Sequence, residues 1–318
     1  MPAISVVHYW TAGESDLDRL RALGDVTYHD GYPASDSEMI DRIGTAQIVV
    51  GADAQFPAKV IDACPNLEMI SVWSTGYDNF DLDAVRRRGV TMCNVPGYSR
   101  YSVSEHAWAM VLHLARKLGK ADAYVRGHGF DWSAIQGMEL HGKTVGIVGT
   151  GAIGANSAVI ARGFGCKALA YTLHPDEDRA RRLGVTYVSL PELLARSHII
   201  LPHLPLTPAT QNLLDADAFA QMEQRPILVN TARGGIIEPH ALVDALEQGT
   251  IGGAGLETLW QEPPDWESPL VQKLMGFDNV VFSPHCAAIT PESMAQLTAI
   301  CIDNVEAYLA GKPTNVIA

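Results

Sequence analysis

The chain has 318 residues and a net charge of −13, from 36 acidic and 23 basic side chains. This acidic balance argues against nucleic acid or an anionic membrane surface as a partner. The length suits about two domains, and a hydrophobic content of 47% supplies their cores. The five cysteines are scattered without a C-x-x-C pair, so we expect reduced thiols and no disulfide framework.

Short β-branched segments alternate with helical patterns, which predicts parallel sheets with helices on both faces. In the first part of the chain, strands are expected at 4–9, 47–50, 69–73 and 90–93. A strand at 145–148 leads into a glycine-rich turn, and further strands are expected at 167–171, 199–202, 227–230, 251–256 and 279–283. The start of the chain lacks a signal-peptide pattern, and no apolar run reaches membrane-spanning length. We therefore expect a cytoplasmic protein without a membrane partner.

Three helices stand out in the pattern. The segment 103–118 is apolar on nearly all sides, so it must be buried, either in a core or in a dimer contact. A second helix follows the glycine turn at 155–164. The last, at 291–309, has no strand after it, so we expect it to return to the unit formed by the first hundred residues.

The glycine turn is the most informative stretch. Gly149, Gly151 and Gly154 have G-x-G-x-x-G spacing between a strand and a helix. Such a turn lets backbone N–H groups approach a pyrophosphate, and the helix dipole favours its negative charge. Because the motif has the required strand–turn–helix context, it predicts a dinucleotide site rather than an ordinary turn.

Three further polar side chains follow consecutive predicted strands near the end of the chain. They are Arg233, Glu262 and His285. A guanidinium can bind a carboxylate through two hydrogen bonds, histidine can transfer a proton near neutral pH, and a carboxylate stabilises the imidazolium. Hydride transfer to a 2-oxo acid needs all three functions. The carboxyl ends of strands in an open α/β sheet face a common ligand crevice, so we expect these groups to gather there.

Over nearly its whole length, the chain resembles the D-isomer-specific 2-hydroxyacid dehydrogenases. The segments that carry this resemblance are Ser74-Thr-Gly-Tyr-Asp-Asn-Phe-Asp81, Asn94-Val-Pro-Gly-Tyr-Ser99, Ser102-Val-Ser-Glu-His106, the glycine motif, His203-Leu-Pro-Leu-Thr207, Asn230-Thr-Ala-Arg-Gly234, Glu262-Pro263 and Pro284-His285. The resemblance implies an NAD(P)-dependent oxidoreductase that interconverts a 2-oxo acid and a D-2-hydroxy acid. Some of these segments are most similar to those of hydroxypyruvate and glyoxylate reductases.

The resemblance also implies the architecture. It predicts two doubly wound parallel-sheet α/β domains, Rossmann-like or flavodoxin-like, with a cleft between them. Residues 1–100 and 289–318 would form the substrate-binding domain, and residues 101–288 the dinucleotide-binding domain. We also expect a homodimer, for which the apolar helix at 103–118 offers a contact surface.

Roles for individual residues follow from the same resemblance. Arg233 would bind the substrate carboxylate and carbonyl, His285 would be the acid/base, and Glu262 its partner. Backbone N–H groups around Thr75, Gly76 and Tyr77 would complete the carboxylate site, together with Arg233 and His285. The expected cofactor contacts are Gly149, Gly151, Ala152, Ile153, Gly154, Thr172, His174, His203, Pro205, Thr231, Ala232, Arg233, Glu257 and His285.

The chain departs from the family pattern at three positions. Thr172 stands where an acidic residue usually holds the ribose hydroxyls of NAD, and His174 stands near a basic position of NADP-using reductases, so NAD(H) and NADP(H) both remain open. Glu257 replaces an aspartate near the nicotinamide carboxamide. Cys286 follows His285 where glycine is usual, and we interpret it as a spectator thiol.

Three other functions could use a glycine-rich turn or the same fold. A dinucleotide-binding corepressor of the same fold would bind without useful turnover, formate oxidation would place glutamine at Glu262, and a methyltransferase would need neither Arg233 nor His285. The eleven histidines form no H-E-x-x-H motif or Cys/His cluster, so no metal site is expected.

Overall fold

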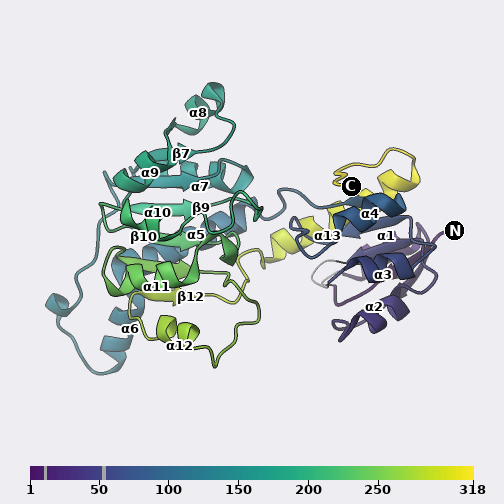
Figure 1. Cartoon of the computed structure of the whole chain (residues 1–318), viewed down its shortest axis with the longest axis horizontal. Helices are drawn as coiled ribbons and strands as arrows, with labels where there is room; N and C mark the ends of the chain where they lie inside the picture. Colours follow the sequence, from purple (N-terminus) through teal and green to yellow (C-terminus); the bar gives the residue numbers. More distant parts are fainter. Residues whose placement is uncertain (11–12, 52–54) are drawn as a thin grey trace. The chain divides into compact units, whose positions relative to one another are not determined.

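The computed structural model describes residues 1–10, 13–51 and 55–318. The chain forms two compact units, shown in Figure 1. The first contains Met1–Ser99 and Ile289–Ala318, and the second contains Arg100–Ala288. The second unit is therefore inserted between two segments of the first.

The first unit is built on a five-stranded parallel sheet in the order β2-β1-β3-β4-β5. The strands β3 and β4 are buried on both faces, as expected for apolar strands inside a parallel sheet. Its helices form two groups, because α1 packs with α13 whereas α3 packs with α2 and α4. The elements are β1 (Ala3–Val6), α1 (Glu14–Arg21), β2 (Asp25–Tyr28), α2 (Asp36–Ile43), β3 (Ile48–Gly51), α3 (Ala58–Ala63), β4 (Met69–Val72), α4 (Leu82–Arg88), β5 (Thr91–Cys93) and α13 (Pro291–Leu309).

The end of the chain completes this unit. Helix α13 packs against β4, where Ser71 Oγ donates a hydrogen bond to the carbonyl of Cys301 over 2.9 Å. The Met92 N–H donates to the carbonyl of Ala318 over 2.8 Å. The sheet of the first unit therefore depends on residues that lie more than two hundred positions later in the sequence.

The second unit has a seven-stranded parallel sheet in the order β12-β11-β10-β9-β6-β7-β8. From β6 the strands are added toward one edge of the sheet as far as β8, and from β9 they are added toward the other edge, so the carboxyl ends of β6 and β9 form a topological switch point. The elements are α5 (Arg100–Arg116), α6 (Leu118–Arg126), η1 (Trp132–Ala134), β6 (Thr144–Val148), α7 (Ala152–Gly163), β7 (Lys167–Tyr171), α8 (Glu177–Leu183), β8 (Val185–Tyr187), α9 (Leu190–Arg196), β9 (Ile199–Pro202), α10 (Ala216–Ala220), β10 (Ile227–Asn230), η2 (Gly234–Ile236), α11 (Pro239–Glu247), β11 (Gly253–Leu256), α12 (Pro269–Met275) and β12 (Val280–Phe282).

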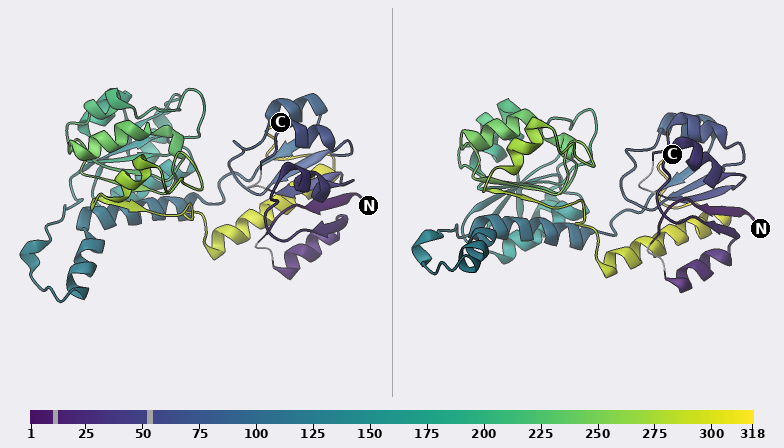
Figure 2. Two further views of the ribbon diagram at one scale, coloured as in Figure 1. Left: turned by 60° about the horizontal axis from the view of Figure 1, so that its bottom comes forward. Right: turned by 90° about the horizontal axis from the view of Figure 1, so that it is seen from below.

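The apolar helix α5 belongs to the core of the second unit. It packs against α7, β10 and β11, and Ala107, Trp108 and Val111 are fully buried there. Core packing thus accounts for the buried apolar side chains of this helix. In contrast, α6 has no buried residue, and the segment from α6 to η1 projects from the rest of this unit, as Figure 2 shows.

The structure contains two strands that the sequence pattern did not predict. They are β2 and β8, and each lies at an edge of its sheet. The predicted strand at 251–256 begins later, at Gly253, and the strand at 4–9 ends earlier, at Val6. Within the described residues, no helix is both long enough and apolar enough to cross a bilayer.

Candidate active site

The glycine turn joins β6 to α7 at the switch point of the second sheet. Gly149 has a φ of 99°, which favours glycine, and a Cβ atom there would lie 2.4 Å from the carbonyl oxygen of His203. A Cβ atom at Gly154 would lie 2.0 Å from the carbonyl oxygen of Gly149. Gly151, the N-cap of α7, faces open space, and no side chain of the described residues caps it. The turn therefore leaves the N-terminus of α7 accessible to an anion.

The residues expected to hold the adenine ribose follow β7. Thr172 is the first residue after the strand and is partly exposed, and His174 is exposed. Asp176 accepts a hydrogen bond from the Arg179 N–H and caps α8, while Asp178 forms an ion pair with Arg181. The acidic and basic side chains near this strand end thus largely neutralise one another.

The loop after β9 contains His203 and Pro205. Burial lowers the pKa of His203 to about 4, so its ring is neutral, and its Nε2 pairs with Ser157 Oγ over 2.9 Å. Its Nδ1 is buried and makes no hydrogen bond to any described residue. Pro205 is exposed, and its carbonyl accepts a hydrogen bond from Thr210 Oγ1 over 2.7 Å.

Arg233 lies three residues beyond β10, in a loop held by Asn230. The buried Asn230 side chain donates to the carbonyl of Arg233 over 2.8 Å and accepts from the Ala232 N–H over 3.0 Å. Gly234 lets this loop contact the loop after β11, since a Cβ atom there would lie 2.1 Å from the Leu259 carbonyl. The positive charge of Arg233 lowers the pKa of both Glu262 and His285, so the three charged groups are neighbours.

His285 and Glu262 form a hydrogen-bonded pair at the ends of β12 and β11. His285 Nδ1 lies 2.7 Å from Glu262 Oε2, and Glu262 Oε1 accepts from the Leu259 N–H over 3.2 Å. The hydrogen bond to Glu262 raises the pKa of His285, although burial and Arg233 oppose this. Burial opposes ionisation of Glu262, but His285, the Leu259 N–H and the charge of Arg233 together outweigh it and lower the pKa of Glu262. The pair therefore favours imidazolium beside carboxylate.

The backbone around His285 is held by Glu257. His285 has a φ of 52°, in the left-handed region that side-chain-bearing residues adopt rarely and at a cost. Its N–H donates to the Glu257 carbonyl over 3.1 Å, and the Ala287 N–H donates to Glu257 Oε1. Glu257 thus holds the backbone at His285 and at the second residue after it.

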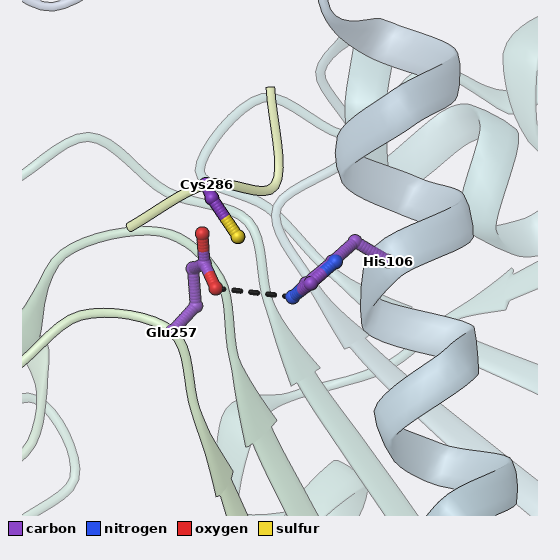
Figure 3. Close-up of side chains that lie close together, drawn as sticks. All are labelled: His106, Glu257 and Cys286. Carbon is purple, nitrogen blue, oxygen red and sulfur yellow. Dashed lines mark ion pairs between the residues drawn. The ribbon is translucent and has the colours of Figure 1, made fainter. Parts of the chain in front are cut away.

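Glu257 also faces His106 and Cys286, as Figure 3 shows. Glu257 is 2% exposed, and its Oε2 lies 3.1 Å from His106 Nε2 but is not aligned for a hydrogen bond to any described residue. Ser283 Oγ lies 2.9 Å from His106 Nε2 and 3.2 Å from Cys286 Sγ. Cys286 is therefore a member of a polar cluster, although the sequence marked it as a spectator.

The loop Thr75–Tyr77 belongs to the first unit and follows β4. Thr75 Oγ1 donates to the Val95 carbonyl over 2.6 Å, and Asn94 Nδ2 donates to the Thr75 carbonyl over 2.8 Å. The Gly76 N–H donates to Ser74 Oγ over 3.1 Å, and Tyr77 packs against the core of this unit. The loop is thereby fixed by its own neighbours.

Three residues that organise this site have no role predicted from the sequence. The first is Asn230, although its place at the end of a predicted strand, three residues before Arg233, is a usable signal. His106 and Ser283 have no such signal, because their contact joins residues 177 positions apart. Thr231 was expected to contact the cofactor, and its Oγ1 is buried without a hydrogen bond to the described residues.

Comparison with known proteins gives a consistent result. A family model described as "D-isomer specific 2-hydroxyacid dehydrogenase, NAD binding domain" matches residues 108–287, more than half of the chain and inside the second unit. Hydroxypyruvate reductase of Blautia hydrogenotrophica is 33% identical over 314 residues, covering 96% of this chain and 95% of that protein. Glyoxylate reductase of Korarchaeum cryptofilum is 34% identical over 296 residues, covering 91% and 88%.

Solved structures share the whole fold. An acyclic imino acid reductase in complex with NADPH and D-Arg matches with a TM-score of 0.91 at 28% identity, covering 99% of this chain and 100% of that one. D-Lactate dehydrogenase of Aquifex aeolicus, complexed with NAD and lactic acid, matches with a TM-score of 0.84 at 28% identity, covering 97% and 96%.

Proposed function

Because the chain belongs to the D-isomer specific 2-hydroxyacid dehydrogenase family, and is thus an NAD(P)-dependent oxidoreductase, we propose that it reduces a small 2-oxo acid such as hydroxypyruvate or glyoxylate. These are the activities named for the relatives from Blautia hydrogenotrophica and Korarchaeum cryptofilum. The corepressor interpretation finds no support among them.

The second unit has the features needed to hold a nicotinamide dinucleotide. The open N-terminus of α7 suits the pyrophosphate, which Gly149, Gly151, Ala152, Ile153 and Gly154 would contact through their backbone. At the ends of β10 and β11, Thr231 Oγ1 and Glu257 Oε2 are buried without hydrogen bonds to the described residues, so they can form hydrogen bonds with the carboxamide of a bound nicotinamide. We assign further contacts to Thr172, His174, His203, Pro205, Ala232, Arg233 and His285. When bound, the reduced nicotinamide supplies the hydride.

The side chains at the strand ends divide the remaining work. Arg233 binds the substrate carboxylate with its planar guanidinium and orients the carbonyl. His285, protonated beside Glu262, donates its proton to the carbonyl oxygen during reduction and accepts one during oxidation. Glu262 holds the imidazole through Nδ1 and stabilises its charge. In the first unit, we propose that backbone N–H groups of the loop Thr75–Tyr77 bind a substrate carboxylate.

The observation that carries this proposal is the hydrogen-bonded pair His285–Glu262 with the charge of Arg233 beside it. The test follows the absorbance of the reduced nicotinamide, with NADH and NADPH each combined with glyoxylate, hydroxypyruvate, pyruvate and a bulkier 2-oxo acid. We expect turnover with at least one small 2-oxo acid. His285→Ala should lose turnover by at least about a hundredfold while dinucleotide binding survives. Equal turnover in this variant would refute the acid/base assignment.

The same assay decides the cofactor. Thr172 places no carboxylate at the end of β7 to repel a 2′-phosphate, so the site accepts NADPH as well as NADH on electrostatic grounds. Thr172→Asp should raise the Kd for NADPH much more than the Kd for NADH. An equal change in both values would show that Thr172 is not near the ribose.

For the assembly state, we propose a homodimer formed through the projecting segment α6–η1. Phe130 and Trp132 are 95% and 90% exposed there. Beside the base of this segment lies a cavity of about 480 Å³, lined by Leu112, Arg116, Gly137, Met138, Glu139, Leu140, His141 and Phe164. A second copy can place its aromatic side chains in this cavity, which buries area that would otherwise face water.

Analytical ultracentrifugation tests this interface. We expect a dimer for the unmodified protein and a monomer for the double variant Phe130→Ser and Trp132→Ser. Trp266→Ser is the matched control, because Trp266 is also exposed, at 55%, but lies outside this segment. A dimer that persists in the double variant would refute the proposed interface.

We also propose a cytoplasmic location. All five cysteines are free thiols and four of them are buried, as expected for a reducing compartment. Recovery of the protein in a secreted or periplasmic fraction would contradict this.

A further inference from the structure

The cluster of His106, Glu257 and Cys286 has a chemistry that hydride transfer does not require. One nitrogen, one oxygen and one sulfur ligand atom lie within 4.8 Å of one another. The three residues come from α5, the end of β11 and the loop after β12 (Figure 3). We propose that they form a zinc(II) site in the dinucleotide-free protein, where zinc competes with the nicotinamide.

The spacing of the ligand atoms fits a tetrahedral zinc ion. Zinc bonds of about 2.0–2.3 Å at tetrahedral angles separate neighbouring ligand atoms by roughly 3.4–3.6 Å. His106 Nε2 and Glu257 Oε2 are 3.1 Å apart, and no pair in the cluster exceeds 4.8 Å. Small rotations of the side chains therefore suffice, and the backbone can stay in place. Three protein ligands leave a fourth position for water.

Burial and charge also favour a cation at this point. The carboxylate of Glu257 is almost completely buried, and its Oε2 makes no hydrogen bond to the described residues. A buried carboxylate is costly unless a positive group or hydrogen bonds compensate it. Glu257 Oε1 is already oriented by the Ala287 N–H, which is the kind of outer hydrogen bond that fixes metal ligands.

Binding requires one proton to leave. The Cys286 thiol loses its proton to the solvent as the sulfur–zinc bond forms, while His106 binds through neutral Nε2. Carboxylate and thiolate together balance the two charges of the ion. Ser283 Oγ gives up its contact with His106 Nε2 and keeps its hydrogen bond to the sulfur of Cys286.

The mixed nitrogen, oxygen and sulfur ligands select the metal. Thiolate and imidazole favour zinc over magnesium or calcium, which prefer oxygen ligands. The competition rests on the proposed function, because that proposal places the nicotinamide carboxamide at Glu257. The metal site itself does not depend on it.

Cobalt(II) is the direct probe of the site. Protein freed of metal by EDTA is titrated with Co²⁺ without any dinucleotide, and we expect the near-ultraviolet charge-transfer band of a thiolate–cobalt bond. Cys286→Ser should abolish this band, whereas the control Cys166→Ser, at a buried cysteine of the same unit, should retain it. Absence of the band in the unmodified protein, or its persistence in Cys286→Ser, would overturn the proposal.

Zinc affinity provides the second readout. His106→Gln should weaken zinc binding by more than the roughly tenfold loss that follows removal of an outer hydrogen bond. His113→Gln, on the same helix, should leave the affinity unchanged. Equal affinities in these two variants would mean adventitious surface binding and would overturn the site.

Competition links the site to the cofactor. We expect Zn²⁺ to raise the apparent Kd of NADH or NADPH in the unmodified protein but not in Cys286→Ser. Failure of the metal site appears in the cobalt spectrum, whereas failure of the proposed function appears as absent turnover in EDTA-treated protein. The two failures are thus distinguishable, and undisturbed dinucleotide binding at saturating zinc would overturn the competition.

Discussion

The two glycines at either side of the first turn of α7 should respond differently to one added methyl group. At Gly154, a Cβ atom would lie 2.0 Å from the Gly149 carbonyl oxygen, and 3.2 Å from Ile147 Cγ2. The oxygen must retreat by about 1 Å to reach the 3.0 Å that real contacts respect. Because that atom is backbone, we expect Gly154→Ala to cost about 3 kcal/mol, the upper end of overpacking effects.

Gly151→Ala should leave the fold intact. The position faces open space, and its φ of −62° and ψ of −166° suit alanine. The loss of an N-cap glycine costs at most about 1 kcal/mol. The new methyl group instead occupies space that the pyrophosphate needs. If one charge-assisted hydrogen bond worth about 1.5–3 kcal/mol is lost, the dinucleotide Kd rises roughly 10- to 100-fold.

Two measurements on the same samples separate these effects. Calorimetry should show the Tm of Gly154→Ala lowered by roughly 6–12 °C, using about 2–4 °C per kcal/mol for a domain of this size. Gly151→Ala should have a Tm within a few degrees of that of the unmodified protein. Titration with the dinucleotide should show the higher Kd in this variant. An unchanged Tm for Gly154→Ala, or an unchanged Kd for Gly151→Ala, would refute the proposed use of this turn.

The remaining predictions concern the strand-end residues. Arg233→Lys should lower kcat/KM about 10- to 100-fold, mainly through KM, because an ammonium cannot form two parallel hydrogen bonds. Arg196→Lys is the surface control. Equal kinetics for the two variants would exclude the Arg233 guanidinium as the group that binds the substrate carboxylate. Reduction needs protonated His285, so the rate of reduction should fall as the pH rises through the raised pKa of His285. Glu262→Gln should shift this descending limb of the kcat/KM profile to lower pH. An unshifted limb would contradict the pairing of His285 with Glu262. Glu257→Ala should lower kcat and Tm together, because the left-handed backbone at His285 loses the hydrogen bond that supports it. Glu257→Gln should restore Tm. An unchanged Tm in the alanine variant would show that the loop around His285 is stable without this side chain.

Much of the fold could be predicted because buried strands of parallel sheets are short apolar runs. The predicted strands at 167–171, 199–202 and 227–230 have the observed bounds. The strands β2 and β8 could not be predicted, because they are edge strands with exposed residues, and β2 contains Asp25. With only four and three residues, these segments are too short for an alternating pattern to indicate a strand, and pairing with the neighbouring strand defines them.

The candidate site also contains residues that could be predicted from the sequence and residues that could not. Arg233, Glu262 and His285 could be named because each follows a recognisable strand, and parallel strands end at the same edge of a sheet. The cluster around Glu257 could not be predicted, since His106 lies on a helix whose apolar pattern indicates core packing and not a site residue. Contacts between distant segments depend on how side chains pack, which spacing along the chain does not encode.

The insertion of one unit within the other has a consequence for biosynthesis. Residues 100–288 form one continuous segment and can fold as soon as they emerge from the ribosome. In contrast, β4 lacks its packing partner until α13 has been synthesised. At about 5–20 residues per second, translation leaves this face of the first sheet uncovered for on the order of ten to forty seconds. A nascent chain stalled before residue 289 should therefore expose an apolar surface that chaperones recognise.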